Sequence, residues 1–169
     1  KKKTQKVKKN LKKLLIENNE VIRSLRKTYK NSYNKKLVNR YNKDQNYRVI
    51  GMGGSTLGTQ TIYDFLRKKI KKNFSFIDNL QAITKKDNDK KITNLVISKS
   101  GNTIETIINT NLLLKKKHKN IFVTENKKSY LYLLAEKLKA DIIHHNNFIG
   151  GRYSVLSEVG MLPAELMGL

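Results

Sequence analysis

Short apolar runs alternate with helix-like segments from residue 47 to residue 145. The runs are YRVIGM (47–52), FSFID (74–78), TNLVIS (93–98), NIFVT (120–124) and DIIHH (141–145). Helical spacing of apolar residues marks TIYDFLRKKI (61–70), the stretch from Ile104 to Leu112, and SYLYLLAEKL (129–138). Strands that alternate with helices pair in parallel, and the helices cover the sheet. We therefore predict an α/β fold, a parallel β-sheet with helices on both faces.

The intervening helices should turn their apolar faces toward this sheet. In the first, Ile62, Phe65, Leu66 and Ile70 share one side, and in the second Ile104, Ile107, Ile108 and Leu112 do so. Residues 1–46 carry a different pattern and are expected to form an N-terminal helical segment before a domain at 47–169. Helical spacing links the apolar residues Val7, Leu11, Leu14, Leu15, Ile22 and Leu25, with lysines on the other face. The spacing predicts one or two surface helices, which we expect to pack on the domain.

Composition excludes several classes of protein. No run of 18 apolar residues appears, and the N-terminus lacks the apolar region of a signal peptide. The absence of cysteine excludes disulfides, thiolate nucleophiles and cysteine-ligated metals, and it fits a reducing cytoplasm. We therefore expect a cytoplasmic protein that does not act at a membrane. The chain begins KKKTQ without methionine and ends in the apolar stretch EVGMLPAELMGL, so we expect a fragment of a longer chain, truncated at both ends.

The net charge of +23 has two interpretations. A nucleic-acid-binding module is one, and it would show an affinity that falls steeply with salt. A bias of composition toward lysine and asparagine is the other. Only six of the 36 basic residues are arginine, the residue preferred for bidentate recognition, and the lysines spread along the whole chain. We therefore favour the second interpretation and expect no nucleic-acid partner, although a positive field would still attract small anions.

Two loops between a strand and a helix consist of small residues. The first is GMGGSTLG (51–58) and the second is SKSGNTIET (98–106), which holds four hydroxyl side chains in nine residues. Ligands of open parallel sheets bind at the carboxyl ends of the strands. Exposed N–H groups at a helix start carry roughly +0.5 of an elementary charge, and they form a site for phosphate to which hydroxyls add donors. Ordinary helix capping would explain one hydroxyl per turn, but not four.

Nucleotide-binding motifs fit these loops poorly. A dinucleotide fingerprint needs a third glycine where Thr56 stands, although Asp78 could serve as the ribose-binding acid. A P-loop needs Lys-Ser or Lys-Thr where Thr59 and Gln60 follow Gly58. The remaining interpretation is a site for a smaller phosphate, held by hydroxyls and amides.

Together with GGRYSVLSEVGMLP (150–163), the two loops resemble the phosphoglucose isomerase family. The loops alone resemble the wider group of sugar isomerase (SIS) domains, and GGRYS separates the two. The resemblance covers residues 47–169 and implies an SIS-like sheet. It also implies an enzyme that interconverts glucose 6-phosphate and fructose 6-phosphate through an enediolate, without metal or cofactor, and a homodimer for the full-length protein. A different SIS-domain protein, such as a regulator that binds a phosphosugar without catalysis, is the alternative.

The resemblance also implies roles for individual residues. It assigns substrate binding to Gly54, Ser55, Ser98, Lys99 (through its backbone), Ser100, Thr103 and Thr106. It assigns Arg152 to catalysis near the reacting carbons, where a guanidinium can stabilise an oxyanion. A structural ion pair is the alternative for Arg152. Glu105 matches a family position, but a carboxylate at a helix start is explained equally well by the helix dipole.

The chain departs from the family pattern at two places. Gly101-Asn102 stands where many members have Phe-Thr, and Glu158 stands where a small residue is usual. The family's general base, a glutamate, and its ring-opening histidine and lysine are implied to follow the GGRYS motif and to lie outside this chain. His118, His144 and His145 do not match that histidine. We expect His118 to be solvated within its lysine run, and the other two to be structural.

Overall fold

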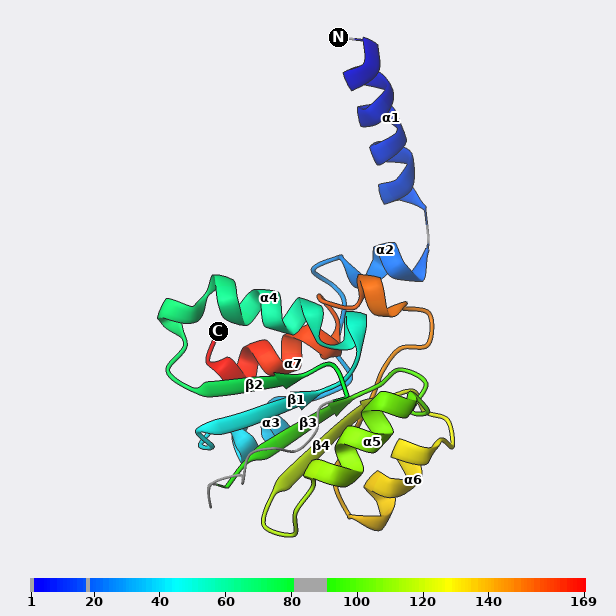
Figure 1. Ribbon diagram of the computed structural model, residues 1–169. Helices are drawn as coiled ribbons and strands as arrows, with labels where there is room; N and C mark the ends of the chain where they lie inside the picture. The colour runs from blue at the N-terminus through cyan, green and yellow to red at the C-terminus, as the bar shows by residue number, and fades with distance from the viewer. Residues whose placement is uncertain (1, 18, 81–90) are drawn as a thin grey trace.

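Five parallel strands form the sheet at the centre of the chain (Figure 1). The computed structural model describes residues 2–17, 19–80 and 91–169. The strands are β1 (Asn46–Ile50), β2 (Asn73–Ile77), β3 (Thr93–Ile97), β4 (Lys119–Thr124) and β5 (Asp141–His144). All four pairings are parallel, in the order β2-β1-β3-β4-β5. The predicted α/β fold is confirmed, and each predicted strand ends within two residues of the observed one.

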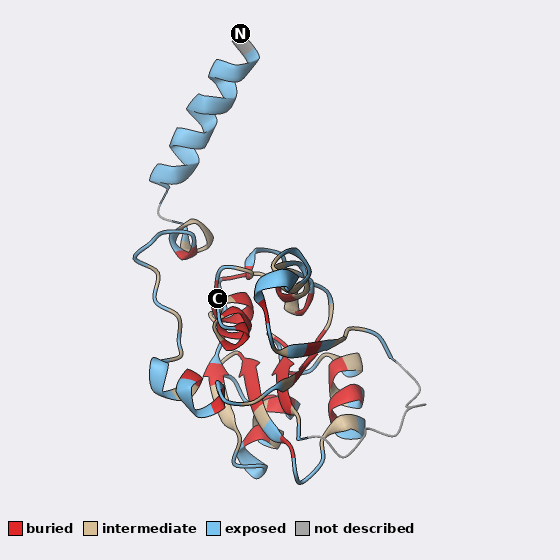
Figure 2. Cartoon of the chain, turned by 90° about the vertical axis from the view of Figure 1, so that its left-hand side faces the viewer, coloured by how far each residue is buried: buried red, intermediate tan, exposed pale blue. Residues whose placement is uncertain are grey.

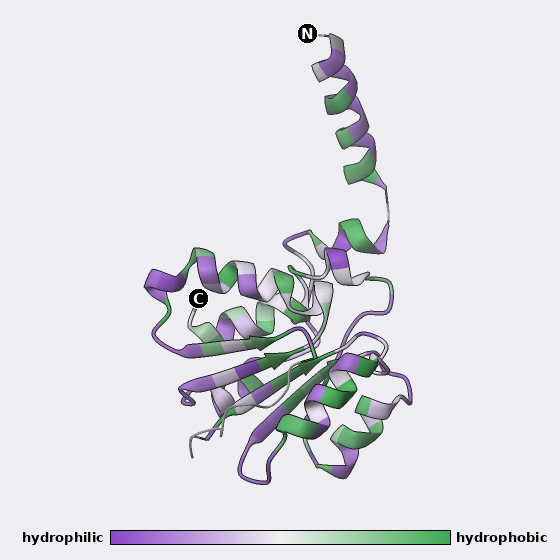
Figure 3. Cartoon of the chain, in the orientation of Figure 1, coloured by the Kyte–Doolittle hydropathy of each residue, from purple (hydrophilic) through white to green (hydrophobic). Residues whose placement is uncertain are grey.

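Alternating residues of the central strands face two separate helical layers. The helices are α3 (Lys35–Tyr41), α4 (Leu57–Phe65), α5 (Ile104–Leu113), α6 (Tyr130–Lys137) and α7 (Glu158–Met167). Leu95 and Ile97 of β3 pack in the core with α3, α4 and α7. Val96 packs in a second core with α5 and α6. The inner strands are therefore buried on both faces and strongly apolar, as Figures 2 and 3 show.

Three short 3-10 helices complete the described structure of the domain. They are η1 (Gly53–Ser55) after β1, η2 (Arg67–Lys69) after α4, and η3 (Gly151–Tyr153) before α7. The sheet is built outward from β1, first to β2 on one side and then to β3 on the other. The chain therefore leaves β1 and β3 toward opposite faces of the sheet, which opens a crevice at their carboxyl ends.

The N-terminal segment holds two further helices, α1 (Lys2–Ile16) and α2 (Glu20–Ser24). The expected surface helices are present, but the expectation that their apolar side packs on the domain is wrong for α1. Val7 is 66% exposed and Leu11 is 55% exposed, and α1 points away from the sheet (Figure 1). Both faces of the sheet are already covered by other helices, which leaves no sheet surface for α1. None of the helices among the described residues has the length and apolar character needed to cross a membrane.

Two predicted helix faces are turned differently in the structure. Helix α5 buries Thr106, Asn109 and Thr110, whereas Ile104 is 67% exposed. In α4, which begins at Leu57 rather than at residue 61, the predicted core residue Phe65 is 86% exposed. Periodicity identifies the stripes of a helix, but it does not show which stripe lies on the sheet when small polar residues allow a close approach. The helix α7 follows GGRYS and was not predicted.

Burial in the core predicts the consequence of shortening a side chain of α7. Leu162 is fully buried between α7 and the sheet. We expect Leu162→Ala to lower the free energy of unfolding by about 2–5 kcal/mol, because the substitution removes buried methyl groups and leaves a cavity. Phe65→Ala is the control, with an expected change of less than about 0.5 kcal/mol, because this larger side chain is exposed. Urea denaturation measures both, and equal losses would contradict the assigned core.

Candidate functional site

The two loops of small residues lie side by side at the carboxyl ends of β1 and β3. These strands are neighbours, with Ile50 opposite Val96. Gly51 follows β1 so closely against β3 that a Cβ atom there would lie 2.7 Å from the Ile97 carbonyl oxygen. Only glycine permits this approach, which brings η1 next to the loop 98–103. The two loops predicted from the sequence to form a site are therefore neighbours at the switch point of the sheet.

The hydroxyls of loop 98–103 bond mainly within the loop. Ser98 Oγ lies 2.9 Å from Thr103 Oγ1, and Ser100 Oγ accepts the Asn102 N–H at 3.2 Å. Thr103 precedes the first residue of α5, but its side chain makes no capping hydrogen bond to that helix. Ordinary capping is therefore the wrong interpretation for Thr103. Its hydroxyl lies beside that of Ser98 instead, and among the described residues no side-chain hydrogen bond caps the first turn of α5.

Gly101 and Asn102, which depart from the usual family residues, dock this loop on α6. Gly101 has φ of +65°, and a Cβ atom there would lie 2.0 Å from Ser129 Oγ. Asn102 Oδ1 accepts the Tyr130 N–H at 2.9 Å, at the first residue of α6. The two residues thus match the start of α6 in this chain, and they leave the hydroxyls of Ser98 and Thr103 in place.

Two other predicted residues of this loop have contrasting surroundings. Thr106 is buried, and within the described part of the chain its hydroxyl has no hydrogen-bond partner. Lys99 is half-buried, and its Nζ donates to the Asn147 carbonyl at 2.5 Å and lies 3.6 Å from the Glu125 carboxylate. The Lys99 side chain therefore ties the hydroxyl loop to the segment that leads to GGRYS.

The third motif packs directly on the first. A Cβ atom on Gly54 would lie 2.3 Å from the Gly151 carbonyl oxygen, so η1 and η3 are in backbone contact. Ser154 Oγ donates to the same carbonyl at 2.7 Å. Between α4 and η3 lies a hollow of about 370 Å³. It is lined by Gly54, Leu57, Gly58, Thr61, Ile62, Gly151, Arg152 and Val155.

Two side chains of this region are available for a ligand. Arg152 is exposed, and no hydrogen bond or ion pair holds its guanidinium among the described residues. The alternative of a structural ion pair is therefore wrong within this part of the chain. Ser55 is half-buried, and its hydroxyl likewise bonds to no described residue. No hydrogen bond joins Arg152 to the loop 98–103 in the described structure, so a ligand would have to bridge the two.

The histidines differ from one another. His118 is 7% exposed, so the expectation that it is solvated is wrong. It closes the turn that begins at Lys115, immediately before β4, which draws it into the fold. His144 is exposed at the end of β5, where its carbonyl accepts the Ser32 hydroxyl. His145 is buried against Glu158, which confirms its structural role.

Glu158 is the polar residue whose importance the sequence did not reveal. Burial by itself would raise the pKa of this carboxyl. Hydrogen bonds from the His145 ring and from the backbone N–H groups of Glu158 and Asn146 outweigh burial and hold the pKa below its usual range. The signal available in the sequence was Ser157-Glu158, a pair typical of a helix start. Among the described residues, no cluster of three or more histidine and acidic side chains could hold a metal ion.

The contact between η1 and η3 predicts how the site responds to added bulk. Gly54→Ala should lower the free energy of unfolding by about 1–3 kcal/mol, because the new methyl group forces the two backbones apart. Gly150→Ala is the matched control, because a Cβ atom there meets only Tyr153 at 3.6 Å and φ is −68°. Urea denaturation of both variants tests this, and a Gly54→Ala variant as stable as Gly150→Ala would contradict the described contact.

Comparisons with known proteins identify the family of this chain. The family model for phosphoglucose isomerase matches residues 2–168. The chain is 38% identical over 138 residues to the glucose-6-phosphate isomerase of Methanocaldococcus jannaschii, covering 74% of this chain and 33% of that protein. It is also 38% identical over 142 residues to the enzyme of Acholeplasma laidlawii, covering 72% and 33%. The chain thus spans about a third of the length of these relatives.

Solved structures share the fold. Hypothetical protein TT0462 from Thermus thermophilus aligns with a TM-score of 0.64 and 24% identity, over 79% of this chain and 36% of that one. Tagatose-6-phosphate ketose/aldose isomerase from Escherichia coli aligns with a TM-score of 0.56 and 17% identity, over 72% and 38%. At these identities the likeness shows the fold alone, while the family match extends over nearly the whole sequence. The chain belongs to the phosphoglucose isomerase family.

Proposed function

We propose that this chain is the phosphosugar-binding part of a glucose-6-phosphate isomerase. Such an enzyme interconverts glucose 6-phosphate and fructose 6-phosphate through an enediolate. One observation carries the proposal: hydroxyl and amide donors converge at the end of β3, while the free Arg152 guanidinium lies beside Gly54 at the end of β1. A sugar phosphate has a dianionic end and a carbonyl end, and these two groups suit it.

The phosphate end would bind at loop 98–103. The hydroxyls of Ser98, Ser100 and Thr103, the Lys99 backbone N–H and the uncapped start of α5 supply directional donors to an anion. Gly54 and Ser55 lie at the neighbouring strand end, where the absence of a side chain on Gly54 lets η3 approach η1 and brings Arg152 to the first loop. Thr106 would support the cradle from beneath, because its buried hydroxyl has no hydrogen-bond partner among the described residues.

The carbonyl end would lie toward Arg152. Isomerisation moves a proton between adjacent carbons and develops negative charge on oxygen, which a permanently charged guanidinium stabilises. Two carboxylates near the site are already engaged, Glu158 with His145 and Glu125 with Lys99. We therefore propose that the general base and the ring-opening groups come from outside residues 1–169, in a full-length cytoplasmic homodimer that needs no cofactor.

A non-catalytic phosphosugar sensor is the second candidate. The NanR protein of Vibrio vulnificus, solved in complex with ManNAc-6P, shares the fold with a TM-score of 0.56 and 19% identity. A sensor needs the phosphate cradle, but it has no need of an unpaired arginine beside the first loop. The exposed Arg152 therefore favours the isomerase.

Removal of the two paired hydroxyls should weaken phosphosugar binding. Each hydrogen bond lost to a charged phosphate costs about 1.5–3 kcal/mol, so Ser98→Ala with Thr103→Ala should weaken glucose 6-phosphate binding by at least about 100-fold. Because the two hydroxyls bond to each other, removing both at once leaves neither of them without its hydrogen-bond partner. Ser75→Ala, which removes a hydroxyl from the edge strand β2, is the control and should bind like the wild type. Isothermal titration calorimetry measures all three, and unchanged binding by the double variant would refute the cradle.

Because the general base is proposed to come from outside this chain, we predict that the chain binds the sugar phosphate without turnover. The purified 169-residue chain should bind glucose 6-phosphate weakly and should not isomerise it, because the general base is supplied from elsewhere. A coupled assay for fructose 6-phosphate tests this, with a full-length glucose-6-phosphate isomerase as the positive control. Turnover by the chain alone, abolished in Arg152→Ala, would show that the base lies within these residues.

A further inference from the structure

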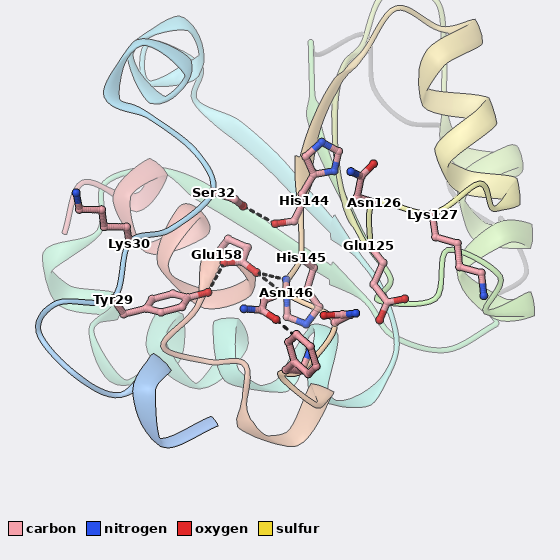
Figure 4. A pocket seen from close by; sticks show the side chains of 12 residues that line it. Tyr29, Lys30, Ser32, Glu125, Asn126, Lys127, His144, His145, Asn146 and Glu158 are labelled. Carbon is pink, nitrogen blue, oxygen red and sulfur yellow. Dashed lines mark hydrogen bonds and ion pairs between the residues drawn. The ribbon is translucent and has the colours of Figure 1, made fainter. Parts of the chain in front are cut away.

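A buried network joins the two ends of the loop that carries Arg152 (Figure 4). His145 follows β5 and Glu158 begins α7, so residues 146–157 form the loop between them. His145 Nδ1 lies 2.6 Å from Glu158 Oε1, and both side chains are only 1% exposed. The same oxygen accepts the Asn146 N–H at 3.1 Å. The loop is therefore closed at its base by bonds that water does not reach.

Both members of this pair have further hydrogen-bond partners. His145 Nε2 lies 3.0 Å from the Ile149 carbonyl oxygen, which can only accept, so Nε2 carries a proton. Glu158 receives donors on both oxygens, from Asn146 on Oε1 and from Tyr29 on Oε2, and this favours the carboxylate. His145 Nδ1 lies opposite Oε1 of this carboxylate. Through the contact of its Nε2 with the Ile149 carbonyl, His145 also holds the backbone three residues before Arg152.

The N-terminal segment is attached to the same network. Tyr29 Oη donates to Glu158 Oε2 at 3.0 Å, and Ser32 donates to the His144 carbonyl, as the dashed lines in Figure 4 show. Burial and the adjacent carboxylate raise the pKa of the Tyr29 hydroxyl well above its ordinary value, so it stays a donor. Two helical turns further along α7, Glu165 accepts a similar hydrogen bond from Tyr33 at 2.8 Å, away from the loop.

We propose that His145, Glu158 and Tyr29 are positioning residues that hold the Arg152 loop against η1. This inference rests on the proposed function. Arg152 has no side-chain partner of its own among the described residues, so the place of its guanidinium depends on its backbone. Directly before Arg152, that backbone is fixed by the contact of Gly151 with Gly54. Two residues earlier it is fixed again at Ile149, which is fully buried and bonded to His145.

The experiment compares two ligands of the 169-residue chain by calorimetry. Inorganic phosphate probes only the cradle, whereas arabinonic acid 5-phosphate adds a carboxylate that mimics the enediolate oxygens. Arg152→Ala defines the loss expected when the arginine contact is absent. We expect Glu158→Gln to weaken binding of the phosphorylated acid at least about fivefold and to change phosphate binding less than about twofold. Glu165→Gln, on the same helix, should change neither.

Conservative tyrosine variants decide the matter if Glu158→Gln does not fold. Tyr29→Phe should show the same selective loss, smaller in size, and Tyr33→Phe should bind like the wild type. An equal loss for both ligands, or no loss for either, overturns the inference.

Amide hydrogen exchange separates this inference from the proposed function. Exchange at residues 149–155 should quicken in Tyr29→Phe and not in Tyr33→Phe, with the loop 98–103 unchanged in both. If the wild type binds neither ligand, the proposed function fails. The exchange rates then still test the network, and unchanged rates at 149–155 overturn it.

Discussion

The site depends on the strand order of the sheet, which is extended first on one side of β1 and then on the other. Because the sheet grows from β1 to β2 and then from β1 to β3, the loops that follow β1 and β3 lie at the switch point of the sheet. Gly51 allows β1 to run close against β3, and Gly54 allows η1 to touch η3. Three motifs that are distant in the sequence therefore meet, and within the described structure no hydrogen bond joins Arg152 to the loop 98–103.

The directional donors of the proposed phosphate site would make it selective even in so basic a chain. With a net charge of +23, electrostatic attraction of anions is general over the surface and is screened by salt. Hydroxyls and amides at a helix start have fixed directions, so they distinguish a phosphate from other anions by geometry. The Lys99 side chain illustrates the division, because it bonds to Asn147 and Glu125 within the protein and leaves the loop's ligand contacts to neutral donors.

The sequence predicted the strands well and the helix faces less well. Strands such as β3 are buried on both sides, so an uninterrupted apolar run marks them without ambiguity. Helix α5 has an apolar stripe and a stripe of Thr106, Asn109 and Thr110, and the small polar stripe lies on the sheet. Burial of His118 depended on the turn before β4, which local polarity did not reveal. The site loops were predictable because their glycines and hydroxyls come in consecutive residues, each close to a strand end.

The network around Glu158 could not be predicted for a different reason. His145 and Glu158 are 13 residues apart, and Tyr29 is 129 residues from Glu158, so no local pattern links them. A buried carboxylate in place of a small residue would ordinarily destabilise the fold, because removing a charge from water is costly. Here Tyr29 of the N-terminal segment and the consecutive residues His145 and Asn146 after β5 bond to it, and the cost is offset only when β5, α7 and the N-terminal segment are all in place. The residue that looks least compatible with the family pattern is thus the one that makes the Arg152 loop conditional on the complete fold.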